Sequence, residues 1–166
     1  MNKKMYITLL VILTMSFIAC NNNAADFRIA PLGNGTAEII DYVGTNQTVR
    51  IPSRIQRMTI TGIGDEAFRN KQIISVTIPN TVTEIGHRAF EGNMLTSLTI
   101  PESVRHLGFD AFARNRLTSV TIGPGWNFRD DFRLIGSGFE DAMRRSGGRA
   151  GTYTRLDTNS TNWTRR

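Results

Sequence analysis

The sequence is poor in the residues that carry covalent or metal chemistry. Cys20 is the only cysteine, so a framework of intramolecular disulfides is excluded. The two histidines, His87 and His106, occupy non-equivalent positions in neighbouring repeats and are not expected to share a face. Zinc needs three or four converging ligands, so no metal site is predicted.

Catalytic motifs are missing as well. The chain has no Gly-x-Ser-x-Gly nucleophile turn and no phosphate-binding loop. Its acidic pairs, Asp130-Asp131 and Glu140-Asp141, are adjacent in sequence, and adjacent residues do not face each other as a general acid and base must. We therefore expect no enzymatic activity and no cofactor.

Long apolar runs are also absent. The longest extends from Met5 to about Ala19, which is shorter than the roughly 20 residues that a spanning helix needs, so a permanent transmembrane helix is not predicted. Lys3 and Lys4 precede this run, an order typical of a secretory signal peptide. It ends in Phe17 to Cys20, which resembles a bacterial lipobox. A lone thiol in an exported chain has no intramolecular partner, so we predict lipid attachment at Cys20; signal cleavage after Ala25, giving a soluble product, is the alternative.

What the sequence does contain is a 22-residue period. One phrase recurs three times, as Ile63 to Phe68, Ile85 to Phe90 and Leu107 to Phe112, and each copy is followed by a second apolar phrase in the same register. One unit of this size cannot bury its own apolar residues, so successive units must stack. A longer unit that begins near Val49 carries a five-residue insertion. The pattern predicts an α/β-type repeat solenoid, a short leucine-rich-repeat array of about four coils with a parallel strand ladder.

Alternation within each coil predicts which side chains face outward. Val76 and Ile78 lie on one side of a short strand, and the hydroxyl residues between them lie on the other. The same alternation recurs in the next two coils. The outward candidates for binding a partner are Ser75, Thr77, Ser97, Thr99, Ser119 and Thr121. The alternative is that these residues only keep an exposed sheet soluble. Phe68, Phe90 and Phe112 are predicted to stack as an interior aromatic column.

The segments outside the repeats are predicted to be caps. A turn at Gly33-Asn34-Gly35 between two alternating runs predicts a hairpin that covers the first coil. Phe139 to Met143 predicts one or two helical turns, which Gly147-Gly148 ends, after a degenerate last coil that begins at Leu134. From Arg149 onward we expect a loosely ordered cap or tail. The predicted divisions are a signal peptide at 1–19, the lipidated cysteine and tether at 20–26, the cap hairpin at 27–47, the repeats at 48–125, and the last coil, cap and basic tail at 126–166.

These repeats resemble the BspA-like leucine-rich repeats, whose coils read approximately L-x-x-L-x-I-P-x-x-V-x-x-I-G-x-x-A-F-x-x-N. Leu95 to Phe112 carries that pattern almost unbroken, and Asn93 and Asn115 occupy the asparagine position. Lys71 and Gly123 depart from it. The resemblance implies a bacterial surface or secreted antigen that adheres to host matrix proteins and to other bacteria.

The charge pattern indicates the kind of partner. After the signal segment, Lys71 is the only lysine, and residues 142–166 hold six arginines against one acid, Asp157. This basic end predicts contact with acidic surfaces such as anionic glycans or lipid head groups; the alternative is that it is simply a solvated terminus, and no motif predicts nucleic-acid binding. Other arginines border the coils, and arginine is suited to bidentate contacts with carboxylate or sulfate, so an acidic glycan or an acidic protein loop is predicted as the partner. We expect a protein or glycan ligand and a lipid-anchored chain at the cell surface or outer membrane. A periplasm-facing scaffold for another envelope component is the alternative, and the oligomeric state is left open.

Overall fold

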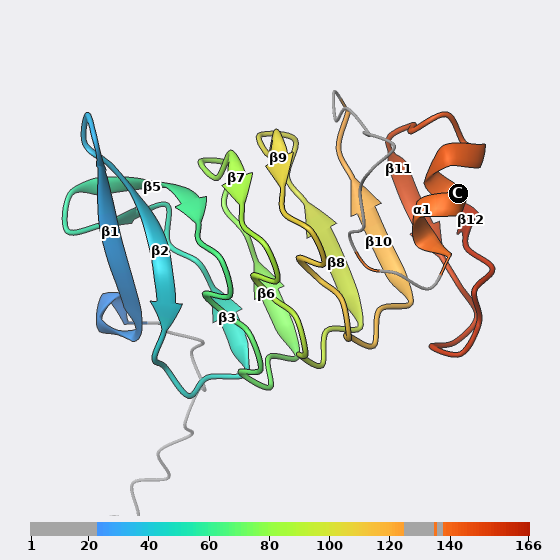
Figure 1. The fold of residues 1–166 in the computed structure, drawn as a ribbon, viewed down its shortest axis with the longest axis horizontal. Coiled ribbons are helices and arrows are strands. Elements are labelled where there is room, and N and C mark those ends of the chain that lie inside the picture. The colour runs from blue at the N-terminus through green and yellow to red at the C-terminus, as the bar shows by residue number, and fades with distance from the viewer. Residues whose placement is uncertain (1–22, 125–134, 136–137) are drawn as a thin grey trace, which may run out of the picture.

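The structure is a computed structural model that describes residues 23–124, 135 and 138–166 (Figure 1). After a short 3-10 helix, Ala24–Asp26, the strands and the single described α-helix follow in this order: β1 (Phe27–Gly33), β2 (Thr36–Tyr42), β3 (Thr48–Arg50), β4 (Arg54–Ile55), β5 (Met58–Ile63), β6 (Ser75–Thr77), β7 (Glu84–Ile85), β8 (Ser97–Ile100), β9 (His106–Leu107), β10 (Ser119–Ile122), α1 (Phe139–Arg145), β11 (Gly151–Thr154) and β12 (Thr164–Arg165). The coils stack side by side into an elongated solenoid with a cap at each end of the described chain (Figure 1).

The predicted parallel ladder is present. Strand β3 pairs in parallel with β6, and β8 pairs in parallel with β10, with Ser97 opposite Ser119 and Leu98 opposite Val120. Strands β6 and β8 lie side by side in neighbouring coils but belong to separate hydrogen-bonded sheets. The structure thus confirms a repeat solenoid of about four coils with a 22-residue period.

A second row of strands, which the sequence did not predict, lies on another side of each coil. Strands β2, β5, β7 and β9 pair in parallel in that order, and β1 covers β2 as an antiparallel hairpin partner. Ile63, Ile85 and Leu107 occupy one register position on β5, β7 and β9 and are buried, so this row closes the core opposite the ladder. The predicted cap hairpin is therefore the first part of a larger sheet.

The five-residue insertion in the first coil forms a tight hairpin. Strand β4 pairs antiparallel with β5, with Arg54 opposite Thr59 and Ile55 opposite Met58. The two connecting residues, Gln56 and Arg57, both have positive φ, at 48° and 69°. This is the conformation that a two-residue type I′ turn requires.

The aromatic column is confirmed. The rings of Phe68 and Phe90 lie 4.7 Å apart at an interplanar angle of 12°, and those of Phe90 and Phe112 lie 5.0 Å apart at 2°. Tyr42 extends the stack toward the N-terminal cap, with its ring 5.4 Å from that of Phe68. The column therefore ties the cap hairpin to the repeats.

Asn93 supplies the hydrogen bonds at the corner beside this column. Its side chain is buried, and its Oδ1 accepts from the backbone N–H of Lys71 at 3.1 Å and of Ile73 at 3.0 Å. Its Nδ2 donates to the carbonyl oxygens of Phe68 at 2.7 Å and Phe90 at 2.9 Å. One side-chain amide thus satisfies four backbone groups of two coils. This explains why the repeat has asparagine at this position.

The loose order expected from Arg149 onward was a wrong prediction, because this segment forms an ordered cap. Strand β11 pairs antiparallel with β10 and β12 pairs with β11, so the segment continues the ladder. Tyr153 and Trp163 are buried, and their rings lie 5.5 Å and 5.1 Å from that of Phe139 in α1. The strand edge of β10 and the apolar face of α1 offer partners that compositional reasoning did not consider.

One of the arginines of this cap, Arg155, has a structural role in its interior. Arg155 is buried, and its Nε donates to the carbonyl oxygen of Leu117 at 2.6 Å. Its guanidinium lies 4.8 Å from the ring centroid of Trp163. Burial lowers the pKa of the Arg155 guanidinium. This arginine is therefore part of the cap interior rather than of a solvated tail.

The helical turn was correctly predicted. Helix α1 spans Phe139–Arg145 and is followed by Gly147 and Gly148, whose φ values are 69° and 67°. Most of the predicted degenerate last coil, from Leu134, lies outside the described residues, as do the signal peptide and Cys20.

Candidate binding surfaces

The outward side of the ladder forms a surface of short hydroxyl side chains, which we call the hydroxyl face. Strand register places these side chains in two ranks that cross the coils. The first rank contains Thr48, Ser75, Ser97, Ser119, Thr154 and Thr164, and the second contains Arg50, Thr77, Thr99, Thr121 and Thr152. Neighbouring strands are about 4.8 Å apart, and residues two apart along a strand are about 6.6 Å apart, so the face is a regular grid.

All six residues predicted for this face lie on it, but their hydroxyl groups differ in exposure and in hydrogen bonding within the protein. Ser75, Thr77, Ser97 and Thr99 are exposed, and their hydroxyls have no hydrogen-bond partner among the described residues. Ser119 and Thr121, in the fourth coil, are half-buried beside β11. The Thr121 hydroxyl lies 2.9 Å from the Thr152 hydroxyl and is thereby engaged.

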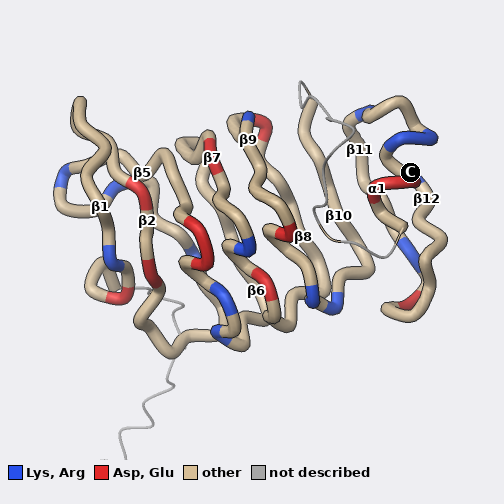
Figure 2. The backbone as a smooth tube through the Cα atoms, viewed as in Figure 1, with Lys and Arg blue, Asp and Glu red and all other residues tan. Residues whose placement is uncertain are grey.

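Sequence reasoning missed the hydroxyl residues that the caps contribute. Thr152 and Thr154 lie on β11, which belongs to the sheet only because it pairs with β10. The alternation Thr152-Tyr153-Thr154 was a local signal, since it places the aromatic ring inward and the threonines outward. The two ranks as given carry no acidic side chain, and Arg50 is their one charged member. Strand β10, for example, carries no charged residue (Figure 2). Arg166, whose backbone N–H donates to the Thr152 carbonyl oxygen, adds a second cation at the C-terminal end of this face.

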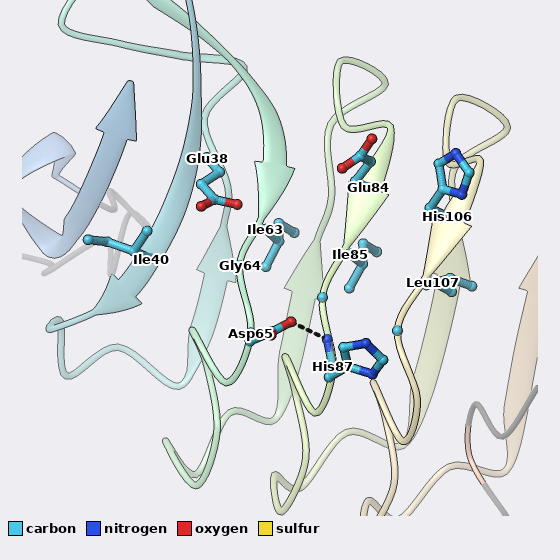
Figure 3. A pocket seen from close by; sticks show the side chains of 12 residues that line it. Glu38, Ile40, Ile63, Gly64, Asp65, Glu84, Ile85, His87, His106 and Leu107 are labelled. Atoms are coloured by element: carbon cyan, nitrogen blue, oxygen red, sulfur yellow. Dashed lines mark hydrogen bonds between the residues drawn. The ribbon is translucent and has the colours of Figure 1, made fainter. Parts of the chain in front are cut away.

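A second candidate surface is a hollow on the other sheet, which we call the acidic hollow (Figure 3). Its rim carries Glu38, Asp65 and Glu84 together with both histidines. Its floor is made by three glycines at 22-residue spacing, Gly64, Gly86 and Gly108. The surface is open and shallow, and it crosses β2, β5, β7 and β9.

The glycine floor follows from how the coils contact each other here. A Cβ on Gly86 would lie 2.4 Å from Asp65 Oδ1, and one on Gly108 would lie 2.2 Å from the backbone nitrogen of His87. Any side chain at these positions would force the coils apart. The Ile-Gly step of the repeat therefore serves the stacking of the coils.

Both histidines line the acidic hollow, so the expectation that they do not share a face was wrong. They lie at different ends of it (Figure 3). His87 already has a structural role, because its ring Nδ1 accepts from the backbone N–H of Phe109 at 2.8 Å. The backbone N–H of His87 in turn donates to Asp65 Oδ1 at 2.6 Å. Within the described part of the chain, no three His, Cys, Asp or Glu residues form a group that could hold a metal ion.

The fold defines a class of protein, a leucine-rich-repeat solenoid. A comparison with protein families matches residues 45–132, more than half of the chain, to the BspA type leucine rich repeat region. The chain belongs to this family. Its members are typically surface or exported bacterial proteins, and proteins of this fold are generally non-enzymatic binding modules.

Solved structures of bacterial leucine-rich repeat proteins are similar in fold. One from Bacteroides capillosus has 22% identity and a TM-score of 0.46, with 59% of this chain and 94% of that chain covered. The leucine-rich repeat protein of T. pallidum has 17% identity and a TM-score of 0.39, with coverages of 55% and 65%. A leucine rich cell surface protein from Faecalibacterium prausnitzii has 16% identity and a TM-score of 0.30, with coverages of 61% and 54%. A comparison with curated proteins gives no significant match.

The described residues contain no helix with the length and apolar character needed to cross a membrane.

Proposed function

We propose that this chain is a non-enzymatic binding module of the bacterial cell envelope, a surface lipoprotein adhesin that recognises host matrix proteins, glycans or other bacteria through its hydroxyl face. The observation that carries the proposal is the set of four exposed hydroxyls, on Ser75, Thr77, Ser97 and Thr99, with no partner among the described residues. Such groups can both donate and accept hydrogen bonds without first breaking a contact within the protein.

Two further features support the hydroxyl face over the acidic hollow. Its side chains are short, so that ordering them against a partner costs little conformational entropy. In the acidic hollow, by contrast, the side chains of Asp65 and His87 accept backbone hydrogen bonds that join neighbouring coils. A ligand that competed for those groups would weaken the stacking of the coils.

Attachment to the membrane is assigned to a lipid on Cys20. The support is the order of the N-terminal segment, with Lys3 and Lys4 before the apolar run and the single cysteine at its end. Several acyl chains, at about 0.8 kcal/mol per buried CH₂, would hold the protein on a membrane essentially permanently. The solenoid would then be presented a short tether away from the lipid.

The proposal is tested on cells that produce the full chain. Thr77→Arg and Thr99→Arg place a long cationic side chain on two exposed positions of the hydroxyl face, and His106→Arg makes the matched change at an exposed position of the other sheet. Adhesion to immobilised host matrix proteins and glycans is expected to fall for both threonine variants and to persist for His106→Arg. Unchanged adhesion of both threonine variants would refute the hydroxyl face as the binding surface.

Location is tested separately by protease treatment of intact cells with a periplasmic protein as control. Loss of the C-terminal cap from a blot while the control survives is expected for a surface adhesin. Full protection of the cap would favour the periplasm-facing scaffold that binds another envelope component.

A further inference from the structure

The hydroxyl face ends at the C-terminal cap in a hollow that the repeats alone do not form, which we call the cap hollow. Thr154 and Thr164 from the first hydroxyl rank line it, together with Arg155, Leu156, Ser160, Asn162 and Arg166. It is therefore continuous with the hydroxyl ranks of the ladder. Its uncharged polar groups are hydroxyls and an amide, which both donate and accept hydrogen bonds.

Arg166 supplies the positive charge of the cap hollow. Its backbone N–H donates to the carbonyl oxygen of Thr152 at 2.9 Å, which extends the pairing of β12 with β11 by one residue. Because side chains alternate along a strand, Arg166 lies on the same side as Thr164. Its guanidinium is exposed and has no hydrogen-bond or ion-pair partner within the described ranges.

The nearest acid in the sequence does not offset this charge by a direct contact. Asp157 Oδ1 accepts from the backbone N–H groups of Asn159 at 2.8 Å and Ser160 at 2.9 Å, so the carboxylate holds the loop between β11 and β12 in shape. Among the described residues that line the cap hollow, the charged ones are the two arginines, Arg155 and Arg166. The Arg155 guanidinium is bonded to the carbonyl oxygens of Leu117 and Ser160, so the Arg166 guanidinium is the one that a ligand can reach without breaking a contact within the protein.

Leu156 adds an apolar contact. It is 92% exposed at the edge of the cap hollow, yet its neighbour Arg155 is fixed by hydrogen bonds to the carbonyl oxygens of Leu117 and Ser160. A single exposed leucine is ordinary on a protein surface. Here it is held on an anchored loop beside a cation and several hydroxyls, which gives it a defined place in a mixed site.

We propose that the cap hollow is the terminal subsite for an acidic glycan whose chain continues along the hydroxyl ranks. The carboxylate or sulfate of one sugar would pair with Arg166, its hydroxyls with Thr154, Thr164, Ser160 and Asn162, and its apolar ring face with Leu156. This inference rests on the proposed function, because it names the ligand class of the same face. The observations favour a glycan over an acidic protein loop, since Arg166 is the one guanidinium of the site without a described partner, whereas several hydroxyls and an amide match sugar hydroxyls.

The test uses the detergent-solubilised full chain and four soluble polymers at one fixed salt concentration. Polygalacturonate carries carboxylates, dextran sulfate carries sulfates, dextran is neutral, and polyglutamate presents carboxylates without sugars. Arg166→Gln removes the cation of the cap hollow, and Leu156→Ser removes the apolar contact. Arg145→Gln is the charge-matched control, since Arg145 is exposed on α1 and does not line the cap hollow.

At least one acidic glycan is expected to bind about tenfold more tightly than dextran and polyglutamate. Arg166→Gln should weaken that binding about tenfold, the loss of one charge-assisted hydrogen-bonded contact. Leu156→Ser should weaken it several-fold, and Arg145→Gln should leave it unchanged. Arg166 and Leu156 are both exposed, so a loss of binding in their variants would not reflect unfolding of the chain.

Three results would overturn the inference. They are equal binding of dextran and the acidic glycans, preference for polyglutamate, and equal effects of Arg166→Gln and Arg145→Gln. None of these three results contradicts the proposed function, which fails only if Thr77→Arg and Thr99→Arg both leave cell adhesion intact. The two proposals therefore fail separately.

Discussion

Replacing Asn93 by alanine should destabilise the solenoid more than any comparable polar truncation in the repeats. The substitution removes the only described hydrogen-bond partner of the Lys71 N–H, the Ile73 N–H and the Phe68 carbonyl oxygen. The Phe90 carbonyl retains a second donor. Leaving a buried polar group unsatisfied costs about 1–3 kcal/mol, and the Lys71 N–H is only partly buried. We therefore expect a loss of about 3–6 kcal/mol in the free energy of unfolding.

Asn115 is the matched control because it occupies the same repeat position one coil later and makes the equivalents of three of the four Asn93 hydrogen bonds. Asn115→Ala orphans two groups, the Leu95 N–H and the Phe112 carbonyl, because the Phe90 carbonyl is still served by Asn93. Asn115 is also less buried than Asn93. Its truncation should cost about 2–4 kcal/mol, which is less than that of Asn93.

Urea unfolding of both variants, followed by far-UV circular dichroism, measures these free energies. Asn93→Asp provides a variant of nearly unchanged shape that retains the acceptor and loses the donor. The reasoning would be refuted by a cost below about 1 kcal/mol for Asn93→Ala, the net value of one ordinary hydrogen bond, or by a larger cost for Asn115→Ala.

Three further predictions concern the core, the cap and the anchor. Phe90→Ala should lower the free energy of unfolding by about 3–5 kcal/mol in urea titrations, whereas Phe109→Ala, at a ring that is 42% exposed, should change it by less than about 1 kcal/mol. Trp163→Ala should increase amide hydrogen exchange in β11 and α1 while the coil around Phe90 keeps its protection, and uniform loss of protection would contradict a locally stabilised cap. Cys20→Ala should release the chain from the membrane fraction with its far-UV spectrum unchanged, and retention of the variant would rule out the lipid anchor.

The repeats could be predicted because packing against the neighbouring coils restricts which residue type each of these positions can hold. A phenylalanine every 22 residues must stack on its neighbours, and a glycine at the Ile-Gly step is the only residue that lets the coils approach. Alternation along the ladder placed Ser75 and Thr77 outward by the same local rule. These features depend on residues within one coil and its copy in the next.

The second row of strands and the C-terminal cap could not be predicted, because they depend on contacts between segments that share no sequence pattern. Strands β7 and β9 contain two residues each, too few for any periodicity to reveal. The C-terminal cap forms because β11 meets the edge of β10, about thirty residues earlier in the chain, and because α1 buries Tyr153 and Trp163. Thr152, Thr154 and Arg166 could be placed beside the hydroxyl residues of the repeats only once that pairing was known.

The contacts between coils join residues at the same offset in the chain. Asp65 bonds to the backbone of His87, His87 to that of Phe109, and the Thr118 side chain to the Thr96 carbonyl, each 22 residues away. A duplicated coil would therefore find every partner that it needs in the copies on either side, and both caps would keep their own contacts. Unequal recombination can thus lengthen or shorten this protein in whole coils, and each added coil would extend its hydroxyl face by about 4.8 Å while using contacts that the existing coils already make.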